Sequence, residues 1–455
     1  MNTSSLAGKV IRAPSLKRGK NGEASLGEKV KLERVLGLTV SSNAALDCDP
    51  DTELVVYPAG CTVVLFNPIK NRQSHLLNIS RKTITCLALS PDGHYLVTGE
   101  CGHLPLVRVW DLHEEGSPGV QVAEFPSHKY GINCVGLVTR TTKQQARYKE
   151  VGVELLIAWY QSVQGLPGAL SLRGYKSDIA FSPSNKYVVS VGSQHDMIIK
   201  EAVPLMGRSA ILGEQRNNYF CDVACGHGKT GDSTYAITKS GLLCEFNNRR
   251  LLDKWVELRT TSANCIALGE NFIFIGCAEG IVRCFTPSTL QFVTTLPRTH
   301  YLGVDVAQGL SISHMAVHPT NAKYPDAVAL AYDPQNCKLT CIYNDHSMYI
   351  WDVRDIKRVG KSYSFLFHSA CIWGVDMYPV LEDNTTSAMP HGCFITCSSD
   401  DTIRVWNLDP SLPLPSCPSL SLVANPYFQL SSSEHQMGGA SNHLELLPSN
   451  FFPCR

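Results

Sequence analysis

Short runs of alternating apolar residues, separated by turns, recur along this chain. The clearest example is the stretch 84–112, in which the alternating run Ile84–Ala88 is followed by the turn Ser90–Gly93 and by two further runs. The last of these runs ends on Trp110-Asp111. Period-two runs between turn residues predict antiparallel strands. A fourth run at 120–125 completes a four-stranded unit, whose two apolar faces need similar units on either side.

Comparable units repeat through most of the sequence. Two later units also end their third run on tryptophan, at Trp351-Asp352 and at Trp406-Asn407. The predicted units cover residues 45–66, 84–125, 132–199, 221–258, 264–296, 327–367 and 371–408. About seven units of roughly 40 residues predict an all-β fold, a β-propeller of about seven blades.

The third unit departs from this pattern. Residues 137–176 form an atypical insert, in which Val153, Leu156, Ile157 and Tyr160 have helical rather than alternating spacing. This spacing predicts an amphipathic helix at about 142–163, which would bind a partner or pack on the propeller.

Both ends of the chain lack strand periodicity. Residues 1–30 are polar and basic, and residues 411–455 are rich in serine, proline and leucine. We expect two disordered tails around a propeller that spans 31–410. Ser15 lies among basic residues and is a possible phosphorylation site, although a short motif of this kind is weak support.

The composition excludes several classes of protein. Hydrophobic residues make up 44% and charged residues 18%, and the 40 basic residues balance the 40 acidic ones, so we expect neither nucleic-acid binding nor a membrane partner. The N-terminal residues MNTSSLAGKVIRA lack the apolar core of a signal peptide, so we expect none, and no apolar run approaches the roughly 20 residues of a membrane span. The 18 cysteines include no C-x-x-C pair, which indicates free thiols in a reducing, cytoplasmic compartment.

Cysteines four residues apart were considered as metal ligands. Such residues lie about 13 Å apart on one face of a strand, which is too far for one zinc ion. We therefore expect buried thiols, no metal and no cofactor. The pairs are Cys221 and Cys225, Cys337 and Cys341, and Cys393 and Cys397.

Several runs resemble one protein family, the large WD-repeat scaffolds of the c-Jun N-terminal kinase pathway. They include KVKLERVLGLTV, SPDGHYLVTGECGH, RRLLDKWVELRT, YNDHSMYIWDVRD and TCSSDDTIRVWNLD. The family comprises the MAP kinase-binding protein and a microcephaly-associated spindle-pole paralogue, and the run HYLGVDVAQGL favours the latter. The likeness covers 28–136, 177–200 and 202–408. A missing blade after Ile199 and the altered sequence after Leu408 suggest a truncated or altered form of the family's N-terminal WD-repeat β-propeller.

The resemblance also assigns roles to loop histidines. His128, His346 and His368 lie between predicted strands, and a catalytic base there would need a nucleophile and an acid within reach. In WD repeats such a histidine bonds to a turn aspartate, so we expect a structural role, best seen in His368 and Asp400. The residues expected to fix the blades are Trp110, Asp111, His128, Asp345, Trp351, Asp352, His368, Thr396, Asp400 and Trp406.

The function implied by the resemblance is a non-enzymatic protein-interaction scaffold. Its setting would be c-Jun N-terminal kinase signalling and the organisation of the mitotic spindle pole and centrosome, with MAP kinases and spindle-pole or centrosomal proteins as partners. Kinase docking and dimerisation belong to the family's C-terminal region, so a homo- or hetero-dimer would require that region. One alternative is a structural fragment that competes with the full scaffold without binding a kinase. Another is a propeller hydrolase, which would need clustered acids or a metal at the central channel.

Overall fold

The regular structure is almost entirely strand, as the alternating pattern predicts. The computed structural model describes residues 32–113, 118–126, 131–139, 153–160, 176–181, 187–192, 198–201, 207–302, 321–377, 393–400, 402–407 and 421–423. Three short 3-10 helices also occur within these residues: η1 (Asn43–Ala45), η2 (Gly213–Asn217) and η3 (Gly228–Thr230). None of the described helices is long and apolar enough to cross a membrane.

The strands pair antiparallel in chain order, so each sheet is a meander. The N-terminal half begins with two four-stranded sheets, followed by a two-stranded sheet and another four-stranded sheet. Their strands are β1 (Asp47–Asp49), β2 (Leu54–Ala59), β3 (Thr62–Asn67) and β4 (Arg72–Leu77); β5 (Ile84–Leu89), β6 (Tyr95–Glu100), β7 (Val107–Asp111) and β8 (Val120–Phe125); β9 (Ile132–Thr139) and β10 (Val153–Tyr160); and β11 (Lys176–Phe181), β12 (Tyr187–Gly192), β13 (Ile198–Glu201) and β14 (Gly207–Ser209).

Four further four-stranded sheets follow. Their strands are β15 (Phe220–Cys225), β16 (Thr234–Thr238), β17 (Leu242–Phe246) and β18 (Leu252–Glu257); β19 (Ala263–Leu268), β20 (Ile273–Cys277), β21 (Val282–Phe285) and β22 (Phe292–Thr295); β23 (Ala327–Asp333), β24 (Lys338–Tyr343), β25 (Ser347–Asp352) and β26 (Gly360–Leu366); and β27 (Ile372–Met377), β28 (Cys393–Ser398), β29 (Thr402–Asn407) and β30 (Ser421–Val423).

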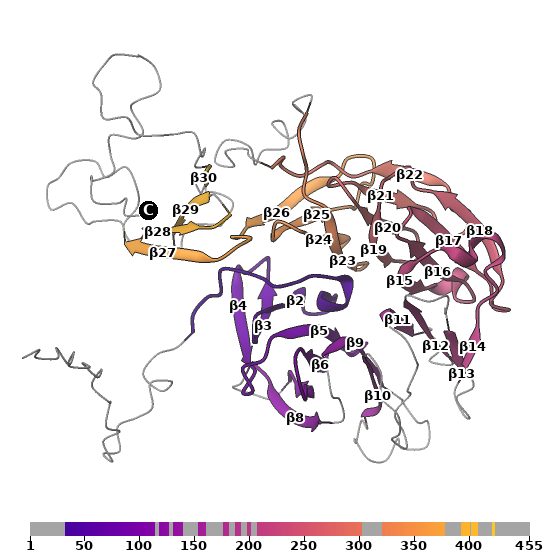
Figure 1. Cartoon of the computed structure of the whole chain (residues 1–455), viewed down its shortest axis with the longest axis horizontal. Coiled ribbons are helices and arrows are strands. Elements are labelled where there is room, and N and C mark those ends of the chain that lie inside the picture. The colour runs from indigo at the N-terminus through magenta and orange to yellow at the C-terminus, as the bar shows by residue number, and fades with distance from the viewer. Residues whose placement is uncertain are drawn as a thin grey trace, which may run out of the picture.

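The sheets from β1 to β26 form a ring of seven blades. Their first strands are neighbours in the order β1, β5, β9, β11, β15, β19 and β23, and β23 lies beside β1. The fourth strands β4, β8, β18 and β22 lie at the rim (Figure 1). An apolar cluster joins the first and last blades, packing Tyr57 and Phe66 against Ile342 and Phe365. The propeller is therefore closed.

Side-chain hydrogen bonds also tie neighbouring blades together. The carboxylate of Asp47 accepts the backbone N–H of Leu89 in the next blade at 2.8 Å, and Asp222 accepts that of Ile266 at 2.8 Å. At the closure, the Asn43 side chain accepts the N–H of Leu330 at 2.8 Å. These bonds link first strands that are far apart in sequence, so they fix the order of the blades.

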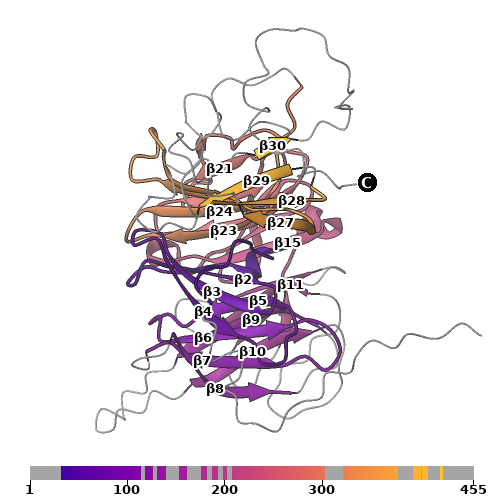
Figure 2. The same cartoon turned by 90° about the vertical axis from the view of Figure 1, so that its left-hand side faces the viewer.

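The last sheet, β27–β30, lies outside the ring, and we call it the outlying sheet (Figures 1 and 2). The unit 371–408, expected as the seventh blade of the ring, forms this sheet instead. The seventh place is filled because the unit expected at 132–199 divides into two sheets, β9–β10 and β11–β14. In consequence β27, unlike the first strands of the blades, exposes apolar side chains to solvent.

The predicted helix at about 142–163 is wrong over the part that is described. Residues 153–160 form β10, which pairs antiparallel with β9 from Val153 opposite Thr139 to Tyr160 opposite Ile132. The sequence VELLIAWY contains apolar residues at both helical and strand spacings, and a run this short does not distinguish them. Pairing with β9 decides the outcome.

The expected tails fall mostly outside the described residues. These include the whole N-terminal segment 1–30, with Ser15, and most of the segment 411–455. One part of the C-terminal segment differs from the expectation, because Ser421–Val423 forms strand β30 and pairs with β29.

Candidate protein-interaction site

His368 is held by a chain of hydrogen bonds within the outlying sheet. The indole N–H of Trp406 donates to the Thr396 hydroxyl at 2.7 Å, which lies 2.7 Å from Nε2 of His368. Nδ1 of His368 lies 2.9 Å from Oδ2 of Asp400. The four residues expected to form this arrangement are therefore brought together. Thr396 and His368 are buried, and Asp400 also accepts the backbone N–H of Ser369.

The electrostatics of the His368 network indicate a structural role. Burial lowers the pKa of His368, an effect that its hydrogen bond to the Asp400 carboxylate opposes without overcoming. Burial raises the pKa of Asp400, but hydrogen bonds from Thr402, Ser369 and His368 outweigh this and lower it to about 2. The neutral imidazole donates to an ionised carboxylate and accepts from Thr396. Both ring nitrogens are occupied by these bonds, which fix the loop between β26 and β27.

The Asp400→Asn substitution should change how stability depends on pH. The pKa of Asp400 is lower in the folded chain than in the unfolded one, so its stabilisation is fully present above about pH 4 and is lost as the pH falls toward 2. The difference in melting temperature between the variant and the wild type should therefore be largest above pH 4 and shrink toward pH 2. Thermal melts across this range measure it.

Asp355→Asn is the control, because it removes an exposed carboxylate from the turn before β26. A difference between Asp400→Asn and the wild type that stays constant down to pH 2 would contradict the assigned network.

The blade β23–β26 uses a different histidine from those predicted. Nε2 of His300 lies 2.8 Å from Oδ2 of Asp345, and Nδ1 lies 2.7 Å from the Tyr349 hydroxyl. Tyr349 stacks on the fully buried Trp351, with ring centroids 5.5 Å apart. Asp345 and Trp351 thus have the expected structural positions, and His346, in the turn beside them, does not take the histidine's place. No local motif distinguishes His300 in the sequence.

Asp352 and Asp111 follow the tryptophans of two blades and have different partners. Asp352 accepts hydrogen bonds from Arg354 and from Lys338, the latter at 2.8 Å, and these hold its pKa well below the ordinary value. Asp111 lies 3.3 Å from Nε2 of His94. Trp110 donates to the Thr98 hydroxyl at 3.1 Å, as Trp406 does to Thr396. His128 lies outside the described residues.

In the second blade an ion pair takes the place of the histidine and aspartate. The guanidinium of Arg108 donates to the Glu100 carboxylate and to the Asn78 side chain, and all three residues are buried. Burial raises the pKa of Glu100, but the hydrogen bonds from Ser80 and Asn78 and the charge of Arg108 hold it below its ordinary value. Sequence analysis missed this network, because its members come from three separate segments.

None of the cysteines in the described part of the chain forms a disulfide, and about half of them are buried. Burial raises the pKa of the thiols of Cys86 and Cys244 to about 12, and Cys265 is shifted further still. Cys371, at the start of the outlying sheet, is exposed. The described members of the three pairs are Cys221, Cys225, Cys337, Cys341 and Cys397, and none of them forms a disulfide.

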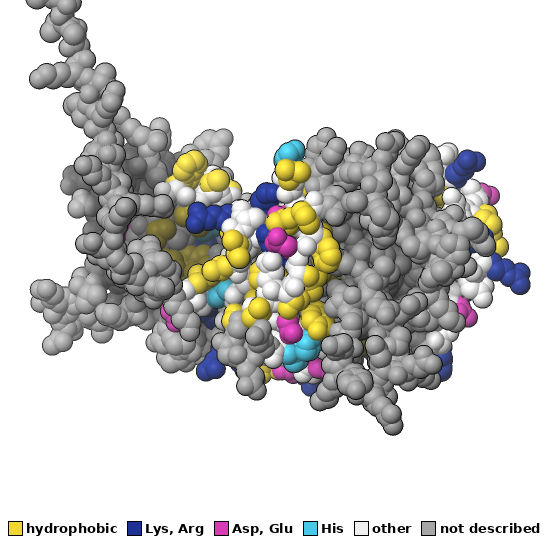
Figure 3. Space-filling view, turned by 90° about the horizontal axis from the view of Figure 1, so that it is seen from below, with side chains coloured by type: hydrophobic (Ala, Val, Ile, Leu, Met, Phe, Trp, Pro, Cys, Tyr) yellow, Lys and Arg dark blue, Asp and Glu magenta, His cyan; other side chains and the backbone are white. Residues whose placement is uncertain are grey.

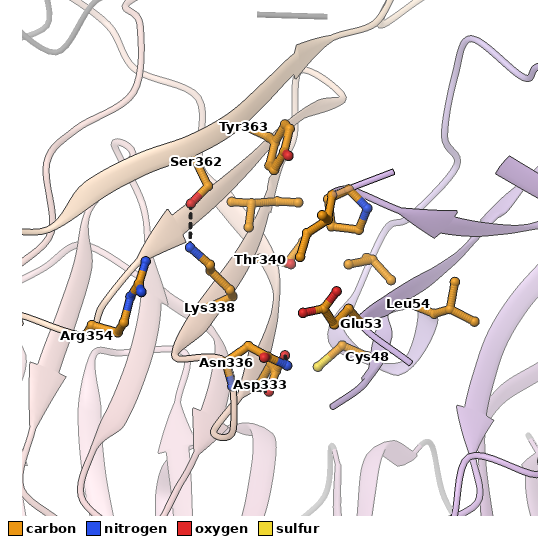
Figure 4. A pocket seen from close by; sticks show the side chains of 14 residues that line it. Cys48, Glu53, Leu54, Asp333, Asn336, Lys338, Thr340, Arg354, Ser362 and Tyr363 are labelled. Atoms are coloured by element: carbon orange, nitrogen blue, oxygen red, sulfur yellow. Dashed lines mark hydrogen bonds between the residues drawn. The ribbon is translucent and has the colours of Figure 1, made fainter. Parts of the chain in front are cut away.

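A pocket of about 380 Å³ lies where the ring closes, between the first blade and the blade β23–β26. Figure 4 shows Glu53, Leu54 and Cys48 on one side, and Lys338, Thr340 and Tyr363 on the other. Lys338 donates to the Ser362 hydroxyl at 2.9 Å as well as to Asp352. Because both cations of its lining, Lys338 and Arg354, are paired with Asp352, the pocket presents a mixed surface in which these charges are neutralised.

Strand β27 carries a cluster of exposed apolar side chains. Trp373 is 73% exposed, Val375 66%, Met377 60% and Ile372 48%. A second, smaller group of apolar side chains lies on the rim strand β8, at Val120, Val122 and Phe125. Figure 3, seen from below, shows yellow apolar side chains interspersed with charged ones on the face where β8 lies in Figure 1. Clustered apolar exposure, especially with tryptophan, is typical of protein interfaces.

The chain matches the family model "WD domain, G-beta repeat" at residues 67–111 and 361–407. It is 50% identical to mouse mitogen-activated protein kinase-binding protein 1 over 88% of this chain, and 45% identical to WD repeat-containing protein 62 of the pig over 85%. The chain belongs to the family of these two proteins. The resemblance stated from the sequence is confirmed, although the higher identity is to the first of them, against the expectation of a spindle-pole paralogue.

The likeness to this family covers only part of the relatives. The chain spans 27% of the mouse kinase-binding protein and 25% of the porcine repeat protein. Among solved structures, a chain of "Crystal Structure of Mitotic Checkpoint Complex" aligns with 90% of this chain and 99% of its own length, at 12% identity and a TM-score of 0.40. That likeness is too distant to bear on function.

Proposed function

We propose that this chain is a non-enzymatic scaffold that binds a MAP kinase of the c-Jun N-terminal kinase pathway. Two relatives support the choice of partner, since mouse and human proteins that are 50% identical to this chain are named for binding a mitogen-activated protein kinase. The histidines that a hydrolase would use as bases, His300 and His368, have their ring nitrogens engaged in structural bonds. Binding therefore accounts for the described residues better than catalysis does.

The observation that carries the proposal is the exposed apolar strand β27. In the ring, the first strand of each blade packs against its neighbours, whereas β27 presents Trp373, Val375 and Met377 to solvent. Tryptophan is among the residue types that most often dominate the binding energy of a protein interface. We assign the kinase contact of this chain to β27, with Trp373 at its centre, rather than to the C-terminal region in which the resemblance alone places kinase docking.

The Trp373→Ala substitution tests this assignment. We expect the full chain to bind purified c-Jun N-terminal kinase in biolayer interferometry. The substitution should raise the dissociation constant by roughly 30-fold or more, which corresponds to a loss of about 2 kcal/mol in binding free energy and is typical of a hot spot. Trp255→Ala is the matched control, because Trp255 is also exposed but lies on the rim strand β18. It should leave the affinity unchanged.

Two results would count against the proposal, in different ways. Equal binding by the wild type and the Trp373 variant would remove β27 as the contact while leaving the kinase as partner. Absence of binding by the wild type would remove the kinase, and would favour the alternative of a structural fragment that competes with the longer scaffold.

The proposed setting is the cytoplasm, with enrichment at the spindle pole and centrosome during mitosis and with spindle-pole proteins as further partners. It rests on the family relationship alone. Fluorescence microscopy of the tagged chain in dividing cells tests it, and diffuse signal through mitosis would contradict it. Any dimer is expected through the C-terminal region of the longer relatives and not through these blades.

A further inference from the structure

Two histidines and an aspartate meet at one corner of the second blade. His94 directly precedes β6, Asp111 ends β7, and His113 follows two residues later. One possible ligand atom from each of the three lies within 4.8 Å of the others. None of these side chains belongs to the Arg108 and Glu100 network that fixes this blade.

The backbone holds these residues in place. The carbonyl of His94 accepts the N–H of Leu112 at 2.9 Å, and Asp111 Oδ1 accepts the N–H of His113 at 2.9 Å. The turn before His94 is also fixed, because Gly93 has φ +65° and a Cβ there would lie 2.6 Å from Oδ2 of Asp49 in the neighbouring blade. The three side chains therefore project from a rigid corner rather than from a free loop.

The arrangement of the donor atoms suits a small borderline cation. Nε2 of His94 lies 3.3 Å from Oδ1 of Asp111, and tetrahedral zinc with bonds of 2.0–2.2 Å needs donors about 3.3–3.6 Å apart. The imidazole of His113 is stacked on that of His94, with centroids 4.5 Å apart and planes 9° apart. His113 is exposed, so rotation of its side chain can bring one of its ring nitrogens to about 3.3–3.6 Å from the donor atoms of His94 and Asp111.

We propose that His94, Asp111 and His113 bind one Zn²⁺ ion, with a fourth position open to water or to a ligand from a binding partner. Two imidazoles and one carboxylate are a donor set that zinc accepts, and an open position is usual when the protein supplies three ligands. The site lies at the ends of the second and third strands of its blade. It is therefore away from the first strands that surround the centre of the ring, where a hydrolase would need its metal.

A zinc titration of the purified full chain tests the site. The chain is stripped with chelator, kept under a non-thiol reductant, and titrated with zinc alone against a chromophoric chelator. The test variants are His94→Gln and His113→Ala, and His103→Ala removes another exposed histidine of the same blade as the control. We expect the wild type and the control to bind one equivalent of zinc. Both test variants should bind it at least ~10-fold more weakly, because losing even a residue that only supports a metal ligand weakens metal affinity 10–100-fold.

Two further readouts separate this site from adventitious binding to the thiols. Cobalt in place of zinc should give the weak visible bands of nitrogen and oxygen ligation, without the intense sulfur charge-transfer band. Zinc should raise the melting temperature of the wild type and of His103→Ala but not of His113→Ala, because binding to the folded state alone stabilises it. Equal zinc binding by all four proteins, or cobalt bound through sulfur, would overturn the proposal.

Discussion

Replacing Glu100 by alanine should lower the free energy of unfolding by about 3–5 kcal/mol, the usual cost of leaving one member of a buried ion pair alone. Arg108 is only 4% exposed, and its guanidinium donates to Glu100 and Asn78. Without the Glu100 carboxylate, the buried charge of Arg108 keeps only the neutral Asn78 side chain and the exposed, more distant Glu124 carboxylate as partners. Urea denaturation followed by tryptophan fluorescence measures the change.

Glu124→Ala is the matched control for Glu100→Ala. Glu124 lies 3.6 Å from the same Arg108 side chain but is 52% exposed, so its loss should cost no more than about 1 kcal/mol. Replacing Glu100 and Arg108 together by methionine should be less destabilising than Glu100→Ala, because no unpaired charge remains. If Glu100→Ala and Glu124→Ala lose the same stability, Arg108 is not buried as the structure shows.

Replacing Trp351 by alanine should also be severe, at about 3–5 kcal/mol, because it opens a cavity in a packed core. Trp351 is fully buried and contacts a cluster that includes Leu339 and Cys341 of its own blade and Phe274 of the preceding one. It also stacks on Tyr349, which bonds to His300. The same denaturation experiment applies.

Two further variants, Trp351→Phe and Trp255→Ala, serve as controls for Trp351→Ala. Phenylalanine keeps an aromatic face against Tyr349 and fills part of the space, so Trp351→Phe should lose less than the alanine variant. Trp255 is 44% exposed on a rim strand, and its replacement should cost little. A loss for Trp351→Ala no greater than that for Trp255→Ala would show that the two blades do not pack through this residue.

The sequence predicted the local parts of the fold correctly. Alternation located most strands, and the resemblance to WD repeats suggested the grouping of His368, Thr396, Asp400 and Trp406, which lie together in the structure. The position of the outlying sheet was not predictable in this way. Residues 371–408 have the same pattern as a blade, and it is the packing of β1 against β23 that leaves them outside the ring.

The remaining errors also arise from long-range contacts. The run VELLIAWY reads as helix or strand, and only its pairing with β9 selects strand. The pairing of His300 with Asp345 spans 45 residues, and that of Asn78 with Arg108 spans 30. Neither has a fixed spacing in the sequence, so single-chain patterns cannot identify them.

The positions of the cysteines allow the opening of individual blades to be followed by thiol labelling. Alkylating reagents attack the thiolate, and burial that raises the thiol pKa of Cys86, Cys244 and Cys284 to about 12 also shields them from reagent. These residues lie in three different blades, whereas Cys371 stands exposed before the outlying sheet. The rate at which each thiol is labelled therefore reports which blade separates first, without any engineered probe.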